Sequence, residues 1–190
     1  MSVQIKKHKQ VIPTYIPRKA NDLPMFFENK PYQGASGRLY PIAYSDGISD
    51  EKTDVEYDVV TLENEYIKTQ VLPQIGGKLL RGYDKVGAHD FIYYNEVIKP
   101  ALVGLAGAWI SGGIEFNWPQ HHRPTTFMPL EAVVEENPDG GKTLWVGEVE
   151  PFDRQKGMAG ITLDAGRSYI KGQKAMWAGT QFFAFSNPPG

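Results

Sequence analysis

The sequence has no cysteine, no long apolar segment and little net charge. The absence of cysteine excludes disulfides, cysteine-bound zinc, iron–sulfur clusters and a thiol nucleophile. The longest run of apolar residues and glycine, 101–110, is half of the ~20 residues that a membrane-spanning helix needs, so we expect no membrane segment. No apolar signal-peptide region follows the basic N-terminus, which predicts a cytoplasmic protein.

Charge and missing motifs exclude further classes. Lys and Arg number 20 and Asp and Glu number 22, a net charge of −2. A protein that binds nucleic acid through phosphate contacts would be more basic, so we expect no nucleic-acid partner. The sequence also lacks the Gly-x-Gly-x-x-Gly, Walker A, His-Glu-x-x-His and Gly-x-Ser-x-Gly patterns.

The high content of 20 Gly and 14 Pro favours turns over long helices. We predict an all-β fold, an antiparallel β-sandwich, in residues 54–171. Residues 1–53 carry spaced prolines and scattered aromatics, which predicts an extended arm that lies on the main domain or contacts a partner. Residues 172–190 are read as a divergent tail.

Alternating apolar and polar residues predict the individual strands. The Asp139-Gly140-Gly141 steps supply the positive φ of a hairpin turn between 130–135 and 143–149. The segment 97–108 contains Pro100, Gly104 and Gly107, which argue against a helix. The other predicted strands are 57–62, 67–72, 78–83, 91–95, 158–163 and 168–171.

One short segment, 109–123, gathers the residues best suited to chemistry. Glu115 lies between Ile114 and Phe116, where partial desolvation would raise its pKa toward the range of a general acid or base. The alternative is a carboxylate paired with Arg123 or Arg81.

Two histidines follow in the same segment. His121 and His122 are adjacent, so on a strand only one can join Glu115, and histidine suits proton transfer near neutral pH. Both could instead be ordinary structural or surface residues. A metal site would lack a third ligand nearby, apart from His89 or Asp90, so we expect no metal and no cofactor.

Aromatic residues flank the carboxylate and predict the ligand class. The rings of Trp109 and Trp118 could stack on a sugar, while Asn117, Arg123 and Arg81 could bind its hydroxyls. The simpler alternative is that both tryptophans belong to the core. A glycosidase would need a second carboxylate about 5–10 Å from Glu115, and the candidates are Asp84, Asp90 and Glu148.

Several segments together resemble an uncharacterised bacterial domain family with the galactose-mutarotase-like fold, often found ahead of tetratricopeptide repeats. The resemblance covers roughly 41–171 and rests on the segments 62–68, 71–78, 98–102, 107–117 and 136–140. The Trp-Ile-Ser-Gly-Gly block at 109–113 is its most specific motif.

The resemblance implies a large β-sandwich that binds sugars and, in mutarotases, moves protons with one glutamate and one histidine. Glu115 and His121 or His122 are the nearest candidates here. Similarity ends after about Lys171, so we expect an incomplete sandwich whose exposed edges favour self-association. The predicted partner is a sugar or oligosaccharide.

We therefore predict a carbohydrate-active or carbohydrate-binding domain, epimerase-like or glycosidase-like if it is an enzyme. The alternatives are a non-catalytic module that binds glycan or protein, and a nonfunctional fragment of such a domain.

Overall fold

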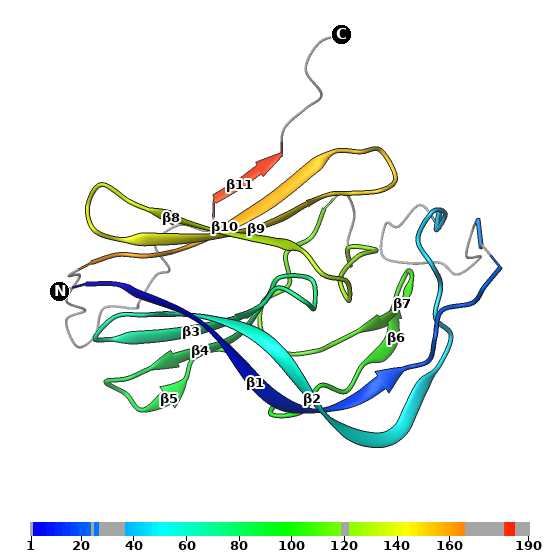
Figure 1. Ribbon diagram of the computed structural model, residues 1–190, viewed down its shortest axis with the longest axis horizontal. Helices are drawn as coiled ribbons and strands as arrows, with labels where there is room; N and C mark the ends of the chain where they lie inside the picture. Colours follow the sequence, from blue (N-terminus) through cyan, green and yellow to red (C-terminus); the bar gives the residue numbers. More distant parts are fainter. Residues whose placement is uncertain (1, 24, 27–36, 119–121, 166–180, 185–190) are drawn as a thin grey trace, which may run out of the picture.

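The structure, a computed structural model, describes residues 2–23, 25–26, 37–118, 122–165 and 181–184, the last range by its backbone alone. These residues contain strands and no helix, as predicted, and hence no helix that could span a membrane. Three antiparallel sheets hold the strands (Figure 1). The first has the order β1 (Gln4–Pro17), β2 (Ile48–Glu63), β3 (Ile67–Leu72), β4 (Lys78–Asp84), β5 (His89–Asp90).

The second sheet has the order β11 (Gln181–Ala184), β10 (Lys156–Leu163), β9 (Lys142–Val149), β8 (Glu131–Glu136), and the third is the hairpin β6 (Ala101–Gly104) and β7 (Gly107–Trp109). The two larger sheets form facing layers (Figure 1). Leu62 and Leu79 of the first layer share one hydrophobic core with Leu144 and Ile161 of the second. The all-β sandwich predicted from the sequence is confirmed.

The central part of the first sheet is buried on both faces. Alternate residues of a strand point in opposite directions, so one strand can contribute to two cores. On β2, Val60 and Leu62 lie in the core between the layers, whereas Tyr57 and Val59 lie in a second core. The second core also contains Ile98 and Ile110, from either side of the β6–β7 hairpin. Each fully buried aliphatic side chain stabilises the fold by roughly 1.5–3 kcal/mol.

Most of the predicted strands are confirmed. The structure has strands across 57–62, 67–72, 78–83 and 158–163, and the 130–149 hairpin closes with the hydrogen bond from Asn137 N to Gly141 O, 2.9 Å. The predicted strand at 91–95 is wrong. Single backbone hydrogen bonds, from Phe91 N to Gly82 O and from Gly113 N to Tyr93 O, hold that segment instead of a ladder. The predicted strand 168–171 lies outside the described residues.

The N-terminal segment contributes a strand to the first sheet. β1 pairs with β2 in register from Gln4 with Glu63 to Tyr15 with Lys52, and β2 runs through residue 53, where the sequence suggested a boundary. Pro13 fits because β1 is an edge strand, where a missing N–H breaks no ladder. Its carbonyl accepts a hydrogen bond from Ile98 N, 2.9 Å.

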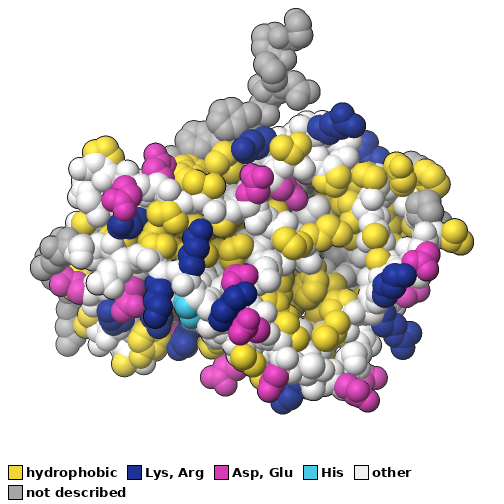
Figure 2. Space-filling view, viewed as in Figure 1, with side chains coloured by type: hydrophobic (Ala, Val, Ile, Leu, Met, Phe, Trp, Pro, Cys, Tyr) yellow, Lys and Arg dark blue, Asp and Glu magenta, His cyan; other side chains and the backbone are white. Residues whose placement is uncertain are grey.

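Acidic and basic side chains are mixed over the face seen in Figure 2. Hydrophobic side chains lie between them on the same face. The backbone of β11 extends the second sheet beside β10 and belongs to the stretch that the sequence suggested as a divergent tail.

Candidate functional site

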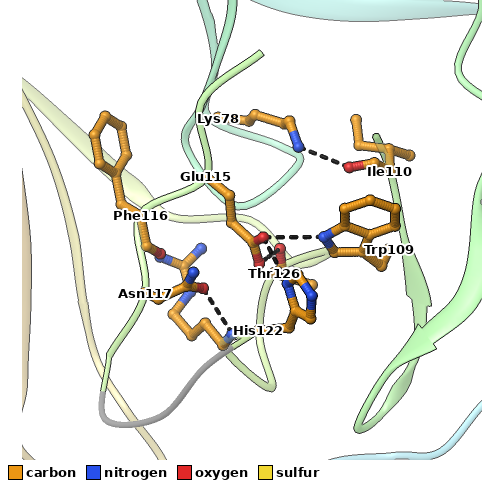
Figure 3. Close-up of polar contacts among 9 residues, drawn as sticks. Lys78, Trp109, Ile110, Glu115, Phe116, Asn117, His122 and Thr126 are labelled. Carbon is orange, nitrogen blue, oxygen red and sulfur yellow. Dashed lines mark hydrogen bonds and ion pairs between the residues drawn. The ribbon is translucent and has the colours of Figure 1, made fainter. Parts of the chain in front are cut away.

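The carboxylate of Glu115 is the centre of a polar cluster at the edge of the first sheet (Figure 3). Its Oε2 accepts hydrogen bonds from Trp109 Nε1 and from His122 Nδ1, both 2.9 Å. Its Oε1 accepts one from Thr126 Oγ1, 2.8 Å. The side chains of Glu115 and His122 are 12% and 15% exposed, so the pair is largely shielded from water but not sealed.

Three separate segments position these groups. Ile114 forms an antiparallel bridge with Leu79 on β4, which fixes the backbone one residue before Glu115. Trp109 is the last residue of β7, and its ring lies 5.2 Å from the His122 ring, tilted by 59°. Thr126 is held in a turn by the hydrogen bond from its N–H to Arg123 O, 2.8 Å. The site therefore depends on tertiary packing.

The pKa of Glu115 is shifted in the direction opposite to our expectation. Burial, the largest influence, raises this pKa, as the sequence suggested. The hydrogen bonds from Trp109, His122 and Thr126, together with the charge of His122, outweigh it and leave the pKa below its usual value. Glu115 is therefore a stable anion, suited to orienting an imidazole rather than to acting as a general acid.

Lys78, the first residue of β4, adds a buried cation beside the site. It is 5% exposed, and its ammonium donates a hydrogen bond to Ile110 O, 2.7 Å (Figure 3). The Nζ atom lies 5.6 Å from the centroid of the Trp109 ring. Burial lowers the pKa of Lys78 from 10.5 to about 8, against the opposing influence of the Glu115 charge.

Arg123 forms a second cluster directly behind the first. It is 0% exposed, and its Nη atoms donate to Phe116 O, 3.0 Å, and Gly76 O, 2.7 Å. Its Nε lies 3.3 Å from Oε1 of Glu148, a carboxylate that also accepts a hydrogen bond from Thr125. This enclosed side chain connects the backbone at Phe116 and Gly76 with the carboxylate of Glu148 and so holds the loop around Arg123 in place. The direct contact with a sugar that the sequence suggested for Arg123 stays a prediction, and the contacts seen here are structural.

A glycine turn connects the two clusters. Gly76 and Gly77 both have φ of +61°, the left-handed region that glycine adopts without strain. A Cβ atom on Gly76 would collide with the carbonyl oxygen of Thr126. The turn thus lets the backbone leading to Lys78 approach the loop that carries Thr126 and Arg123.

Of the other residues predicted for the site, two contact Arg123 and one has separate partners. Asn117 is exposed and accepts a hydrogen bond from Arg123 N, 2.9 Å. Trp118 lies against the Arg123 guanidinium, 4.3 Å from Cζ to the ring centroid. Arg81 pairs with Asp90 on β5 and contacts Tyr83 and Tyr94. His121 lies outside the described residues.

The candidates for a second carboxylate do not contact Glu115. Asp90 is the partner of Arg81, and Asp84 accepts hydrogen bonds from the backbone of Val86 and Gly87. Glu148 is separated from Glu115 by Arg123, which attracts both carboxylates. Within the described part of the chain, no three His, Asp or Glu side chains group closely enough to hold a metal ion.

Lys78 and Thr126 are the site residues that sequence reasoning missed. Lys78 follows Gly76-Gly77, in the position of an ordinary turn lysine, and Thr125-Thr126 carries no motif. The strand pattern could have indicated that Lys78 is buried. Lys78 and Leu80 lie on the same face of β4, and Leu80 is in the second core.

The fold and the site define an all-β sandwich protein with a carboxylate–imidazole pair at the edge of one sheet. Residues 35–183 match a family described as a domain of unknown function, DUF5107. The match covers more than half of the chain, and the chain belongs to this family.

A solved structure supports the same fold. It is a TPR-domain containing protein from Parabacteroides distasonis, 22% identical with a TM-score of 0.75. The match covers 86% of this chain and 27% of that protein, so the chain spans about a quarter of its relative's length. The likeness shows the arrangement of strands.

Proposed function

We propose that the protein binds a sugar at the Glu115 site and moves a proton through His122, as in an aldose epimerase. One observation carries the proposal: a largely shielded, anionic carboxylate accepts a hydrogen bond from His122 Nδ1 beside the ring of Trp109. The resemblance of 109–117 to the galactose-mutarotase-like family supports the same ligand class.

The hydrogen bond assigns the roles of the two groups. An ionised carboxylate only accepts hydrogen bonds, so His122 must donate from Nδ1, and the lone pair of the neutral ring is then on Nε2. Nε2 can take the proton of the anomeric hydroxyl as the bond between C1 and the ring oxygen breaks. The imidazolium then gives this proton from Nε2 to the ring oxygen, C1 becomes a carbonyl carbon, and reclosure gives either anomer. Glu115 stabilises the imidazolium that forms.

This chemistry needs no co-reactant, because the proton lost by one oxygen is balanced by the proton gained by the other. Hydrolysis is the weaker alternative. A glycosidase needs two carboxylates that flank the scissile bond. The candidate for the second carboxylate, Glu148, is already bound to Arg123 and Thr125.

A binding module without catalysis is the second candidate. Both carboxylate oxygens of Glu115 already accept hydrogen bonds from side chains, which suits a site that holds its shape. In that case Trp109 and Glu115 would form a sugar-binding surface with no proton transfer.

The test begins with thermal melting of the purified chain in a panel of mono- and oligosaccharides. A ligand that binds only the folded state raises the midpoint, by about 2.7 kcal/mol of stability at 100 times its dissociation constant. Anomeric exchange of the sugar that binds is then followed by NMR. The variants are His122→Gln and, as a matched control, His89→Gln on exposed β5.

The epimerase proposal expects exchange that depends on His122 and not on His89. Binding without accelerated exchange would favour the module, and binding with release of a reducing sugar would favour hydrolysis. A cooperative melt that no sugar shifts would overturn the carbohydrate proposal.

A further inference from the structure

A buried lysine contacts the site without an ion-pair partner. Lys78 is 5% exposed, and within the described residues no carboxylate oxygen lies within ion-pair distance of its Nζ. Glu115 influences it only at longer range. Burial of an unpaired ammonium is expensive, and a methionine or leucine would fill a core position without that penalty. The contacts of the ammonium are therefore informative.

Those contacts all involve the end of β7. The ammonium donates to the carbonyl of Ile110 and lies near the face of the Trp109 ring. The same indole donates through Nε1 to Glu115, which in turn accepts from His122. The chain of contacts runs from β4 through Trp109 to the carboxylate–imidazole pair (Figure 3).

We propose that Lys78 is a positioning residue, whose ammonium fixes the Trp109 indole in the orientation that donates to Glu115. Cation–π attraction is strongest where water is excluded, as it is here. The hydrogen bond to Ile110 O holds the backbone next to the same tryptophan. The inference deepens the proposed function because it concerns the same site, but its test needs no sugar.

The proposal predicts that the site changes with pH. Because the pKa of Lys78 is lowered to about 8, the cation is lost in a range where an ordinary lysine stays charged. The titratable and charged groups that face this region are Glu115, His122 and Arg123, all from the segment after Ile114. The segment at the end of β7 contributes Trp109 and Ile110, neither of which titrates.

The experiment follows the indole N–H resonance of Trp109 by two-dimensional NMR across pH 6 to 10 without ligand. Trp109→Phe assigns the resonance by its loss. Lys78→Met removes the charge, and Lys78→Arg keeps a charge that does not titrate in this range. Lys85→Met is the matched control. Lys78 begins β4, whereas Lys85 directly follows the end of β4 and binds Glu63 and the Asn64 carbonyl.

We expect a transition of the Trp109 resonance with a midpoint near 8 in the wild type and in Lys85→Met. Lys78→Met and Lys78→Arg should lack it. Indole hydrogen exchange should be about tenfold faster in Lys78→Met, the effect of losing one shielded cation–π contact. It should stay near the wild-type rate in Lys78→Arg.

Two outcomes overturn the proposal. One is a Trp109 resonance whose pH dependence and exchange rate are the same in Lys78→Met as in the wild type. The other, if Lys78→Met does not fold, is a folded Lys78→Arg that keeps the transition near pH 8. Neither outcome bears on whether a sugar binds, so this test and the melting test fail independently.

Discussion

Glu115 and Glu148 accept hydrogen bonds from neighbouring threonines but have different charged or titratable partners. Thr126 donates to Glu115 and Thr125 donates to Glu148. Glu115 is paired with a histidine, whereas Glu148 is paired with Arg123. The two carboxylates are almost equally exposed, at 12% and 13%. Exposure therefore does not distinguish the two carboxylates, whereas the partner side chain does.

The difference separates an arginine ion pair from a carboxylate–imidazole pair, the arrangement on which the proposed proton transfer rests. Arginine stays protonated at every accessible pH, and here it is fully buried and bonded to the backbone at Gly76 and Phe116. Histidine can gain and lose a proton near neutral pH. The turn at Gly76 and Gly77 thus lies beside both the Arg123 cluster and the proposed site at Glu115.

The largest effect should follow from breaking the structural pair. Removal of one partner of a buried ion pair leaves an uncompensated charge and costs about 3–5 kcal/mol. We expect Arg123→Ala to lower the free energy of unfolding by this amount in urea denaturation. Arg81→Ala, which removes the more exposed pair with Asp90, should cost about 1 kcal/mol or less. Equal losses for the two variants would contradict the assignment.

Lys78, the buried cation near Glu115, should differ from Arg123 in how it responds to high pH. The pKa of Lys78 falls from 10.5 to about 8 on folding. Between these values the unfolded chain binds more protons, so stability should rise with pH, by up to about 3 kcal/mol. Urea denaturation of the wild type and Lys78→Met from pH 7 to 10 measures the difference. Parallel curves would show that Lys78 titrates normally.

The shared turn can be tested through its glycine. Alanine at Gly76 would need φ of +61° and would collide with Thr126 O, and we expect a loss of about 2 kcal/mol or more. Gly140 has φ of +81°, but a Cβ there would meet only Ala165 Cβ at 3.6 Å. Gly140→Ala should therefore cost about 1 kcal/mol. Thermal melting compares the two, and a milder Gly76→Ala would remove the steric argument.

The smallest effect concerns Glu115 in acid. Its pKa is lowered below 4.5 in the folded chain, so its contribution to stability is present above pH 4.5 and is lost as pH falls through the folded value. Glu115→Gln should be less stable by about 1 kcal/mol at neutral pH. That deficit should shrink in acid, whereas exposed Glu131→Gln should track the wild type. A deficit that persists at low pH would point to lost packing instead.

The sequence predicted the local features of this fold well. The hairpin between β8 and β9 is set by its own turn at Asp139-Gly140, and the strands β3 and β4 follow from short-range alternation. Glu115 was found because a carboxylate between two apolar residues is costly unless it has partners, and three donors are in fact present.

Long-range packing explains what could not be predicted. The donors to Glu115 come from positions 109, 122 and 126, and the sign of its pKa shift depends on their geometry. The burial of Arg123 required Gly76 and Glu148, far away in sequence. The prolines of β1 suggested an arm because nothing local reveals that the strand lies at an edge.

The edge strand β1 also affects the order in which the sheets can assemble. Its residues pair with partners between 31 positions away (Pro17 with Ile48) and 59 positions away (Gln4 with Glu63). Closing such a long loop costs conformational entropy before the strand pairing can offset that cost. The β8–β9 hairpin, in contrast, closes over a few residues. We expect the second sheet to form first and to serve as the surface on which the first sheet, and with it the Glu115 site, is completed.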